Sequence, residues 1–203
     1  MTSDAVALSK SLSWLLRHGA GEAGLAMDEA GWAEVSDVLD VLGMTRAQLD
    51  LAIANNDKGR LVVEGSRVRA CQGHSLAHMP VTREALEASW QVVQPKVSLW
   101  HGTRAAAIEG IAREGIVAGL RSHVHLAESA DSHVGKRSAV DFLVEVLPAK
   151  LAEAGIGVFR SPNGVMLVRH VPLTAIVGLR PCSRAGRRDE DRARRLLGLE
   201  PVQ

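Results

Sequence analysis

The sequence contains no tyrosine and only two phenylalanines among its 203 residues. A hydrophobic core must therefore be built from Leu, Val, Ile and Ala side chains, with the four tryptophans as its large members. Hydrophobic residues still make up 46% and charged residues 23% of the chain, which is typical of an ordinary globular protein. The length and composition predict one large domain or two small ones.

Long apolar runs and cysteine pairs are also missing. No apolar run approaches the roughly 20 residues that a membrane-spanning helix needs. Asp4 and Lys10 interrupt any signal-peptide core near the N-terminus. The two cysteines, Cys71 and Cys182, lie far apart and form no pair with metal-ligand spacing. We therefore expect a cytoplasmic protein without membrane contact and without a metal site.

The net charge of +1 excludes no class of partner, but the placement of arginine is informative. Arginine greatly outnumbers lysine, and many arginines stand beside His or Gly rather than beside a carboxylate. The guanidinium group is planar and can bind a phosphate through two parallel hydrogen bonds. Local arginine positions thus indicate a phosphate ligand more clearly than the overall charge does.

The first half of the chain predicts three helices. Apolar residues at helical spacing indicate a helix over residues 6–16, which Gly19 ends. Ser36 is a candidate cap for a second helix that continues to Gly43. Thr45 and Gln48 have the spacing of a capping box at the start of a third helix.

A β-hairpin is predicted to follow these helices. Two β-like runs, Leu61–Glu64 and Arg67–Ala70, are separated by a Gly65-Ser66 turn. Three helices and a hairpin resemble a winged helix, a shape common in nucleic-acid-binding proteins, although a fold-level analogy assigns no function. We expect residues 1–92 to form a winged-helix RNA-binding lobe.

The second half predicts an α+β lobe over residues 97–181 with a mostly antiparallel sheet. Helix and strand patterns alternate after the linker at 94–96, and a Ser-Pro-Asn-Gly turn at 161–164 separates two late strands. A charged tail over residues 182–203 follows. Its arginines and carboxylates indicate a solvated or frayed helix, with an RNA-contacting tail as the alternative.

Three arginines and one histidine in the first 121 residues are candidates for phosphate chemistry. Arg17 and His18 end the first predicted helix, where a simple C-terminal cap is the alternative. Arg69 lies opposite Val62 in the hairpin and has no obvious local partner, whereas Arg67 lies opposite Glu64. A solvated arginine is the alternative for Arg69. Arg121 begins a run whose alternating positions also hold two histidines.

The run Arg121-Ser122-His123-Val124-His125-Leu126 is predicted to be a strand with Arg121, His123 and His125 on one face. Upstream, Trp100-His101-Gly102-Thr103 is predicted to lie where a strand ends and a helix begins. Exposed backbone amides at such a junction favour anionic or polar ligands. The tripeptide His101-Gly102-Thr103 alone is weak evidence of a binding site.

Taken together, these segments resemble the RNA 2′-phosphotransferase family, over roughly residues 8–180. The resemblance is carried, in order along the chain, by Leu12-Ser13-Trp14-Leu15-Leu16-Arg17-His18, Gly31-Trp32, Arg67-Val68-Arg69-Ala70 with Gln72-Gly73-His74-Ser75, Trp100-His101-Gly102-Thr103, His123-Val124-His125-Leu126, and Phe159-Arg160-Ser161 with Asn163-Gly164-Val165. It implies an N-terminal winged-helix RNA lobe and a C-terminal ADP-ribosyltransferase-like lobe that binds NAD.

The resemblance also implies site residues and a reaction. The family's catalytic quartet falls on Arg17, His18, Arg69 and Arg121, and NAD contacts fall on His101, Gly102, Thr103, His125, Arg160, Asn163 and Gly164. The RNA 2′-phosphate would attack the nicotinamide ribose of NAD and release nicotinamide. The ribose 2″-hydroxyl would then attack phosphorus, giving 2′-hydroxyl RNA and ADP-ribose 1″,2″-cyclic phosphate.

The chain departs from the family pattern at Ala127, where a small hydroxyl residue is expected, and at Val158 and Met166, where aromatic residues are common. These changes affect the expected packing of NAD and leave the quartet intact. Two other functions remain open: NAD-dependent ADP-ribosylation of nucleic-acid phosphate ends, and a winged-helix RNA-binding module without catalysis. We expect a monomer acting on 2′-phosphorylated RNA, tRNA included; the sequence does not identify the physiological RNA.

Overall fold

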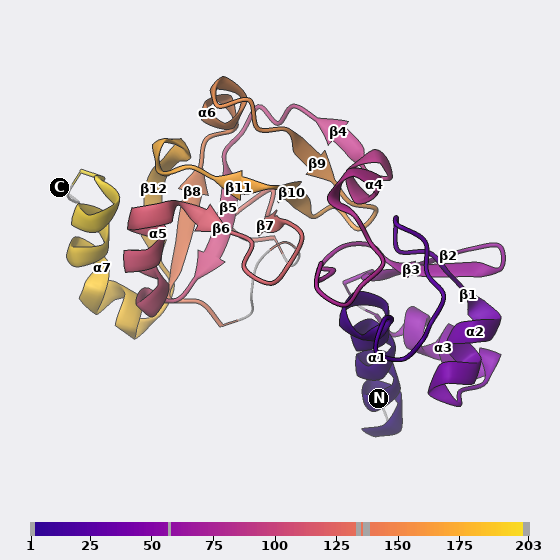
Figure 1. The fold of residues 1–203 in the computed structure, drawn as a ribbon. Helices are drawn as coiled ribbons and strands as arrows, with labels where there is room; N and C mark the ends of the chain where they lie inside the picture. Colours follow the sequence, from indigo (N-terminus) through magenta and orange to yellow (C-terminus); the bar gives the residue numbers. More distant parts are fainter. Residues whose placement is uncertain (1–2, 57, 133–134, 136–138, 201–203) are drawn as a thin grey trace. The chain divides into compact units, whose positions relative to one another are not determined.

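A computed structural model of the chain describes residues 3–56, 58–132, 135 and 139–200. The chain divides into two compact units, which are drawn in Figure 1. Unit 1 runs to Gln91 and adds two short segments, Leu120–Ser122 and Ser161–Asn163. Unit 2 contains the remainder from Val92 onward. The two short segments mean that residues far apart in sequence join the N-terminal unit.

Unit 1 contains the predicted N-terminal helices, and Thr45 caps one of them as expected. Its hydroxyl accepts the backbone N–H of Gln48 while the Gln48 side chain accepts the backbone N–H of Thr45, so the capping box is confirmed. The prediction for Ser36 was wrong: Glu34 occupies the N-cap position, and the Ser36 hydroxyl donates to Asp37. The helices are α1 (Ser3–Trp14), the π-helix η1 (Leu15–Gly19), α2 (Val35–Leu42), α3 (Arg46–Ala54) and α4 (Arg83–Ala88).

The predicted hairpin is confirmed by strands β2 (Leu61–Glu64) and β3 (Arg67–Ala70). Glu64 pairs with Arg67 across the turn, as a two-residue connection requires. Gly65 adopts φ 60°, a conformation that favours glycine. A short strand β1 (Ala33–Glu34) completes a three-stranded sheet in the order β1-β3-β2.

Unit 2 is built on antiparallel ladders, which confirms the α+β prediction. The strands pair in the orders β12-β8-β5, β4-β9-β10-β7 and β11-β6, and the ladders β12–β8, β5–β8, β10–β7, β10–β9 and β11–β6 are antiparallel. The strands are β4 (Gln91–Val93), β5 (Leu99–Thr103), β6 (Ile116–Val117), β7 (Val124–Leu126), β8 (Phe142–Val146), β9 (Val158–Arg160), β10 (Met166–Val168), β11 (His170–Val171) and β12 (Ile176–Pro181).

Five helical segments accompany these strands. They are the 3₁₀-helices η2 (Ala105–Ala107) and η3 (Leu173–Ala175) and the α-helices α5 (Ile108–Glu114), α6 (Pro148–Glu153) and α7 (Arg184–Leu197). Within the described part of the chain, no helix combines the length and the apolar character that crossing a bilayer requires.

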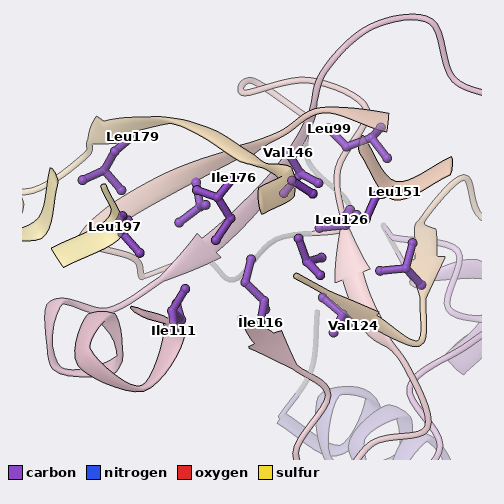
Figure 2. Close-up of a cluster of buried hydrophobic side chains, with 14 of the residues drawn as sticks. Leu99, Ile111, Ile116, Val124, Leu126, Val146, Leu151, Ile176, Leu179 and Leu197 are labelled. Atoms are coloured by element: carbon purple, nitrogen blue, oxygen red, sulfur yellow. The ribbon is translucent and has the colours of Figure 1, made fainter. Parts of the chain in front are cut away.

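Aliphatic side chains dominate the core of unit 2, as the scarcity of aromatic residues predicts. Figure 2 shows this cluster, in which Leu126, Val146 and Ile176 are buried. Phe142 is its one aromatic member among the described residues. Branched aliphatic side chains have few rotamers and pack closely between strands, so a core of this kind can hold a sheet without large rings.

The charged segment after residue 182 forms α7, which is part of unit 2 rather than a separate tail. The Ser183 hydroxyl accepts the backbone N–H of Gly186 and caps the helix. Ala193 and Leu197 are each 3% exposed, and Figure 2 shows Leu197 within the core cluster near Leu179. Arg192 also pairs with Glu109 of α5. The helix is therefore solvated on one face and packed on the other.

Replacing Leu197 with alanine should lower the free energy of unfolding by about 2–5 kcal/mol, because the lost side chain leaves a cavity in the core. Leu196→Ala is the matched control: Leu196 is 39% exposed, and its loss should cost less than about 1 kcal/mol. Urea unfolding followed by circular dichroism measures both. If Leu197→Ala lowered the free energy of unfolding as little as Leu196→Ala does, the packing of α7 would not stabilise unit 2.

Candidate functional site

Arg17 and His18 are placed by a π-helix at the end of α1. The turn Leu15–Gly19 continues α1 without a break, and Leu15 and Leu16 anchor it in the core of unit 1. A Cβ at Gly19 would collide with the Trp14 ring, so only glycine allows this close approach. π-helical turns occur frequently at functional sites because they redirect side chains from the regular helical positions. Both Arg17 and His18 are half-buried.

The segment that follows β3 holds these two residues in place. The backbone N–H of Ser75 donates to the Arg17 carbonyl at 2.9 Å, and the Ser75 Oγ lies 2.8 Å from His18 Nδ1. One guanidinium nitrogen of Arg17, Nη2, donates to Gln72 Oε1 at 3.5 Å. Residues 71–74 are all buried, so this segment is a fixed support rather than a surface loop.

The same segment places Arg121, the third member of the predicted quartet. Ser75 forms an antiparallel bridge with Arg121, and the backbone N–H of Ser122 donates to the His74 carbonyl at 2.8 Å. Arg83 Nε also donates to the Ser122 carbonyl at 3.1 Å. These contacts bring Arg17, His18 and Arg121 together within unit 1, although they are separated by about a hundred residues of sequence.

The electrostatics of this group indicate a site for an anion. Burial, together with the nearby charges of Arg60 and Arg121, lowers the pKa of Arg17 to about 10. Burial also lowers the pKa of His18 from its usual value, with Arg17 and Arg121 acting in the same direction. We call Arg17, His18, Arg60 and Arg121 the cationic cluster.

No carboxylate is among the described groups that shift the pKa of Arg17 or His18; the one opposing charge on Arg17 comes from the Cys71 thiol. The pKa of that thiol is itself raised by burial, so it contributes little negative charge at neutral pH. The positive charges of Arg60 and Arg121 act against that of Arg17, and a bound phosphate would relieve this repulsion.

Arg69 lies opposite Val62 as predicted, and its hydrogen-bond partners come from segments that are distant in sequence. Its side chain is 5% exposed, and Nη1 donates to the Ser89 Oγ at 2.7 Å and to the Ala30 carbonyl at 3.3 Å. Its guanidinium also lies 4.5 Å from the centroid of the Trp32 ring, a cation–π contact. Register alone could not reveal these partners, because they lie 20 to 39 residues away from Arg69.

Arg69 nevertheless lies on the border of the cationic cluster. Burial lowers its pKa, and Cys71 is the first of the charges that oppose this effect. The charges of Arg69 and Arg17 both act on the pKa of the Cys71 thiol and oppose its rise by burial. One nitrogen, Nε of Arg69, is buried without a hydrogen-bond partner among the described residues. Arg67, which faces Glu64 in register, instead pairs with Asp28 at 3.7 Å.

The predicted strand with one arginine and two histidines on a face was wrong. β7 begins only at Val124, so Arg121 is outside the strand and is grouped with unit 1. His123 is buried and makes an edge-to-face contact with Phe159, with ring centroids 6.4 Å apart. Of the three residues, only His125 lies on the strand itself. Alternation in sequence cannot indicate where a strand begins when a bend precedes it.

His101, Gly102 and Thr103 form the end of β5, and the 3₁₀-helix η2 begins at Ala105, so the predicted strand-to-helix junction is confirmed. Each pairs with a residue of β8, and Thr103 is buried. The Nδ1 of His101 lies 3.0 Å from the His125 carbonyl oxygen. Because a carbonyl only accepts, this contact places a proton on Nδ1 and fixes the orientation of the ring. The contact joins two of the predicted NAD-binding residues within unit 2.

The remaining predicted NAD-binding residues are divided between the units. Arg160 pairs with Glu128 at 3.3 Å, and Gly164 adopts φ 80° beside it in unit 2. Asn163 belongs to unit 1, where its Nδ2 donates to the Lys58 carbonyl at 2.8 Å and its Oδ1 accepts the Ser161 hydroxyl at 2.8 Å. The Asn163 amide therefore fixes a loop of unit 1.

The sequence did not assign roles to three residues that the structure places at the site. Ser75 and Trp32 stand in the motifs but have partners that are distant in sequence, and Arg60 stands outside every motif. A lone serine in a polar segment carries no signal of its own. The described residues contain no group of three His, Cys, Asp or Glu side chains that could hold a metal ion.

The chain is similar in sequence to known proteins over most of its length. Residues 3–170 match the model of the family described as RNA 2′-phosphotransferase, Tpt1/KptA family. A protein of Pseudomonas savastanoi pv. phaseolicola named probable RNA 2′-phosphotransferase is 34% identical over 85% of this chain and 93% of its own length. A protein of Streptomyces coelicolor with the same name is 37% identical over 82% of this chain and 91% of its own.

A third relative of that name, from Burkholderia lata, is 35% identical over 83% of this chain and 88% of its own length. The matches thus span most of the chain and most of each relative, and the family model includes every residue of the cationic cluster. The chain is an enzyme of the transferase class and belongs to the RNA 2′-phosphotransferase family.

Proposed function

We propose that this enzyme removes an internal 2′-phosphate from RNA by transferring it to NAD through an ADP-ribosylated RNA intermediate. The products are 2′-hydroxyl RNA, nicotinamide and ADP-ribose 1″,2″-cyclic phosphate. The observation that carries the proposal is the cationic cluster of unit 1, in which no carboxylate is among the described groups that shift the pKa of Arg17 or His18. Such a cluster suits a dianionic phosphate.

The first step needs positioning more than acid–base catalysis. A phosphate monoester is already anionic at neutral pH, so it can attack the nicotinamide ribose without a general base. Arg17 and Arg121 would hold its oxygens, and Arg69, whose guanidinium is oriented by its cation–π contact and hydrogen bonds, would be a third ligand. In the second step charge builds on the phosphorus oxygens, and fixed guanidinium groups stabilise it.

We propose that unit 2 binds NAD through His101, Gly102, Thr103, His125, Arg160 and Gly164. The oriented His101 ring and the Thr103 hydroxyl offer neutral hydrogen-bonding groups, which suit ribose hydroxyls and a carboxamide. Asn163, already bonded to Lys58 in unit 1, would act by shaping the loop before Gly164. NAD supplies the electrophilic ribose carbon of the reaction.

The lobe assignments belong to the same proposal. Unit 1, with its N-terminal helices and the β2–β3 hairpin, would serve as a winged-helix RNA lobe over residues 1–92, and unit 2 as an ADP-ribosyltransferase-like lobe over residues 97–181. The enzyme acts as a cytoplasmic monomer on 2′-phosphorylated RNA, and a role in tRNA processing is included in the proposal.

The direct test incubates the protein with an oligonucleotide that carries one internal 2′-phosphate, with and without NAD, and follows the products by mass spectrometry. We expect NAD-dependent loss of the phosphate together with ADP-ribose cyclic phosphate. An RNA product that gains ADP-ribose and retains it would indicate an enzyme that ADP-ribosylates the phosphate ends of nucleic acids. No change in either sample would leave an RNA-binding module, which should show salt-sensitive binding without NAD dependence.

Arg121→Ala and Arg69→Ala should each reduce the rate of 2′-phosphate release by at least about 100-fold, because each removes a charge that stabilises the phosphoryl transition state. Arg121→Lys should recover only part of the rate, since an ammonium lacks the planar fork. Arg46→Ala is the matched control, because Arg46 is exposed on α3 and pairs with Asp50. Near-normal turnover of either variant with an unchanged circular dichroism spectrum would contradict this placement of the phosphate.

The pKa of His18 should lie below 6.5 in the free protein and rise when a 2′-phosphorylated dinucleotide binds. Burial and the charges of Arg17 and Arg121 lower it in the free state, and the negative charge of a bound dianion opposes the effect of the two arginines. An NMR titration of the imidazole, assigned with the His18→Asn variant, measures both values. A pKa that ligand saturation does not move would place the phosphate away from His18.

A further inference from the structure

Ser75 is connected to three of the four residues proposed for catalysis. Its backbone N–H donates to the Arg17 carbonyl at 2.9 Å, its Oγ lies 2.8 Å from His18 Nδ1, and its backbone pairs with Arg121 in an antiparallel bridge. Ser75 is 57 residues from His18, 58 from Arg17 and 46 from Arg121 in the sequence. All of these contacts lie within unit 1.

We propose that Ser75 is a positioning residue that selects the tautomer of His18. Its hydroxyl donates to Nδ1, so the ring proton resides on Nε2, and Nε2 presents an N–H donor to the substrate phosphate. This role rests on the proposed function, because it identifies the phosphate as the group that His18 contacts.

The surroundings of His18 favour a neutral ring, for which a tautomer must be chosen. Arg17 and Arg121 are the charged groups that face it, and both disfavour the imidazolium form. A neutral imidazole has one N–H donor and one acceptor nitrogen. The oxygens of a dianionic phosphate can accept hydrogen bonds but cannot donate them. The tautomer that can bind the phosphate is therefore the one that carries its proton on Nε2.

A hydroxyl suits this task better than a carboxylate would. An aspartate or glutamate at position 75 would favour the proton on Nδ1, stabilise the imidazolium and neutralise part of the cationic cluster. Ser75 can donate to Nδ1 without adding negative charge. It therefore orients the ring while leaving the full positive charge of Arg17 and Arg121 available for the phosphate.

The bridge to Arg121 makes Ser75 a link between two parts of the cationic cluster. The backbone contacts of Ser75 do not depend on its side chain, so a substitution that removes only the hydroxyl leaves the supports of Arg17 and Arg121 intact. The hydroxyl and the backbone roles can thus be separated by experiment.

The test compares Ser75→Ala, which removes the hydroxyl, with Ser75→Thr, which keeps it. Nitrogen-15 NMR of the free protein reports the tautomer of His18 directly, and steady-state kinetics with 2′-phosphorylated RNA and NAD report kcat and KM. The control is Ser122→Ala, since the Ser122 hydroxyl is buried in the same unit and has no partner among the described residues.

In the wild type, in Ser75→Thr and in Ser122→Ala, we expect His18 predominantly as the Nε2–H tautomer. In Ser75→Ala we expect a mixture of tautomers and a kcat about 10-fold to 100-fold lower, with KM for NAD changed less than threefold. Ser75→Asp should raise the pKa of His18 and weaken binding of a 2′-phosphorylated dinucleotide.

An unchanged tautomer in Ser75→Ala, or a wild-type ring with its proton on Nδ1, would overturn the inference. A loss of kcat in Ser75→Thr equal to that in Ser75→Ala would also overturn it, because the cause would then be packing. The NMR readout needs no turnover. If the wild type failed to release phosphate while the tautomer responded to Ser75→Ala as expected, the proposed function would fail and the control of the His18 ring by Ser75 would stand.

Discussion

Arg17, His18 and Arg121 are held close together although the charges among them repel, and the fold of unit 1 is arranged to maintain that contact. Burial and the neighbouring positive charges lower the pKa of Arg17 and His18, which means that the folded state disfavours their charged forms at a cost in free energy. The opposing stabilisation comes from backbone hydrogen bonds of segment 71–75: Ser75 donates to the Arg17 carbonyl in the π-helix, and the His74 carbonyl accepts from Ser122. Removing such a segment would allow the cations to separate into solvent.

Neutral groups orient the charged ones throughout this site. Ser75 contacts His18, Gln72 contacts Arg17, and Ser89 together with the Trp32 ring holds Arg69. Hydroxyl, amide and aromatic partners fix geometry without cancelling charge, whereas carboxylates would do both. Carboxylates do act at Arg69, where Glu64 and Asp28 oppose part of the lowering of its pKa by burial.

Several local features of the chain were predictable because their causes lie within a few residues. The Gly65-Ser66 turn sets the register of the hairpin, and Thr45 with Gln48 starts α3, since both depend only on neighbouring backbone groups. Features with distant causes were not predictable. The partners of Arg69 lie on two other segments, and α7 joins unit 2 because Ala193 and Leu197 meet a core formed elsewhere in the chain.

By itself, the sequence determined the class of the fold, the capping box of Thr45 and Gln48, the hairpin register and the residue types that phosphate chemistry needs, because these follow from short-range patterns and from the chemistry of single side chains. Only the tertiary structure decided which of those side chains meet. Arg17 and Arg121 become neighbours through the segment ending at Ser75, and the proton of His18 depends on a hydroxyl 57 residues away. Such pairings are decided by the packing of whole elements, since the free energy that brings distant residues together comes from buried surface and paired backbone groups across the entire unit.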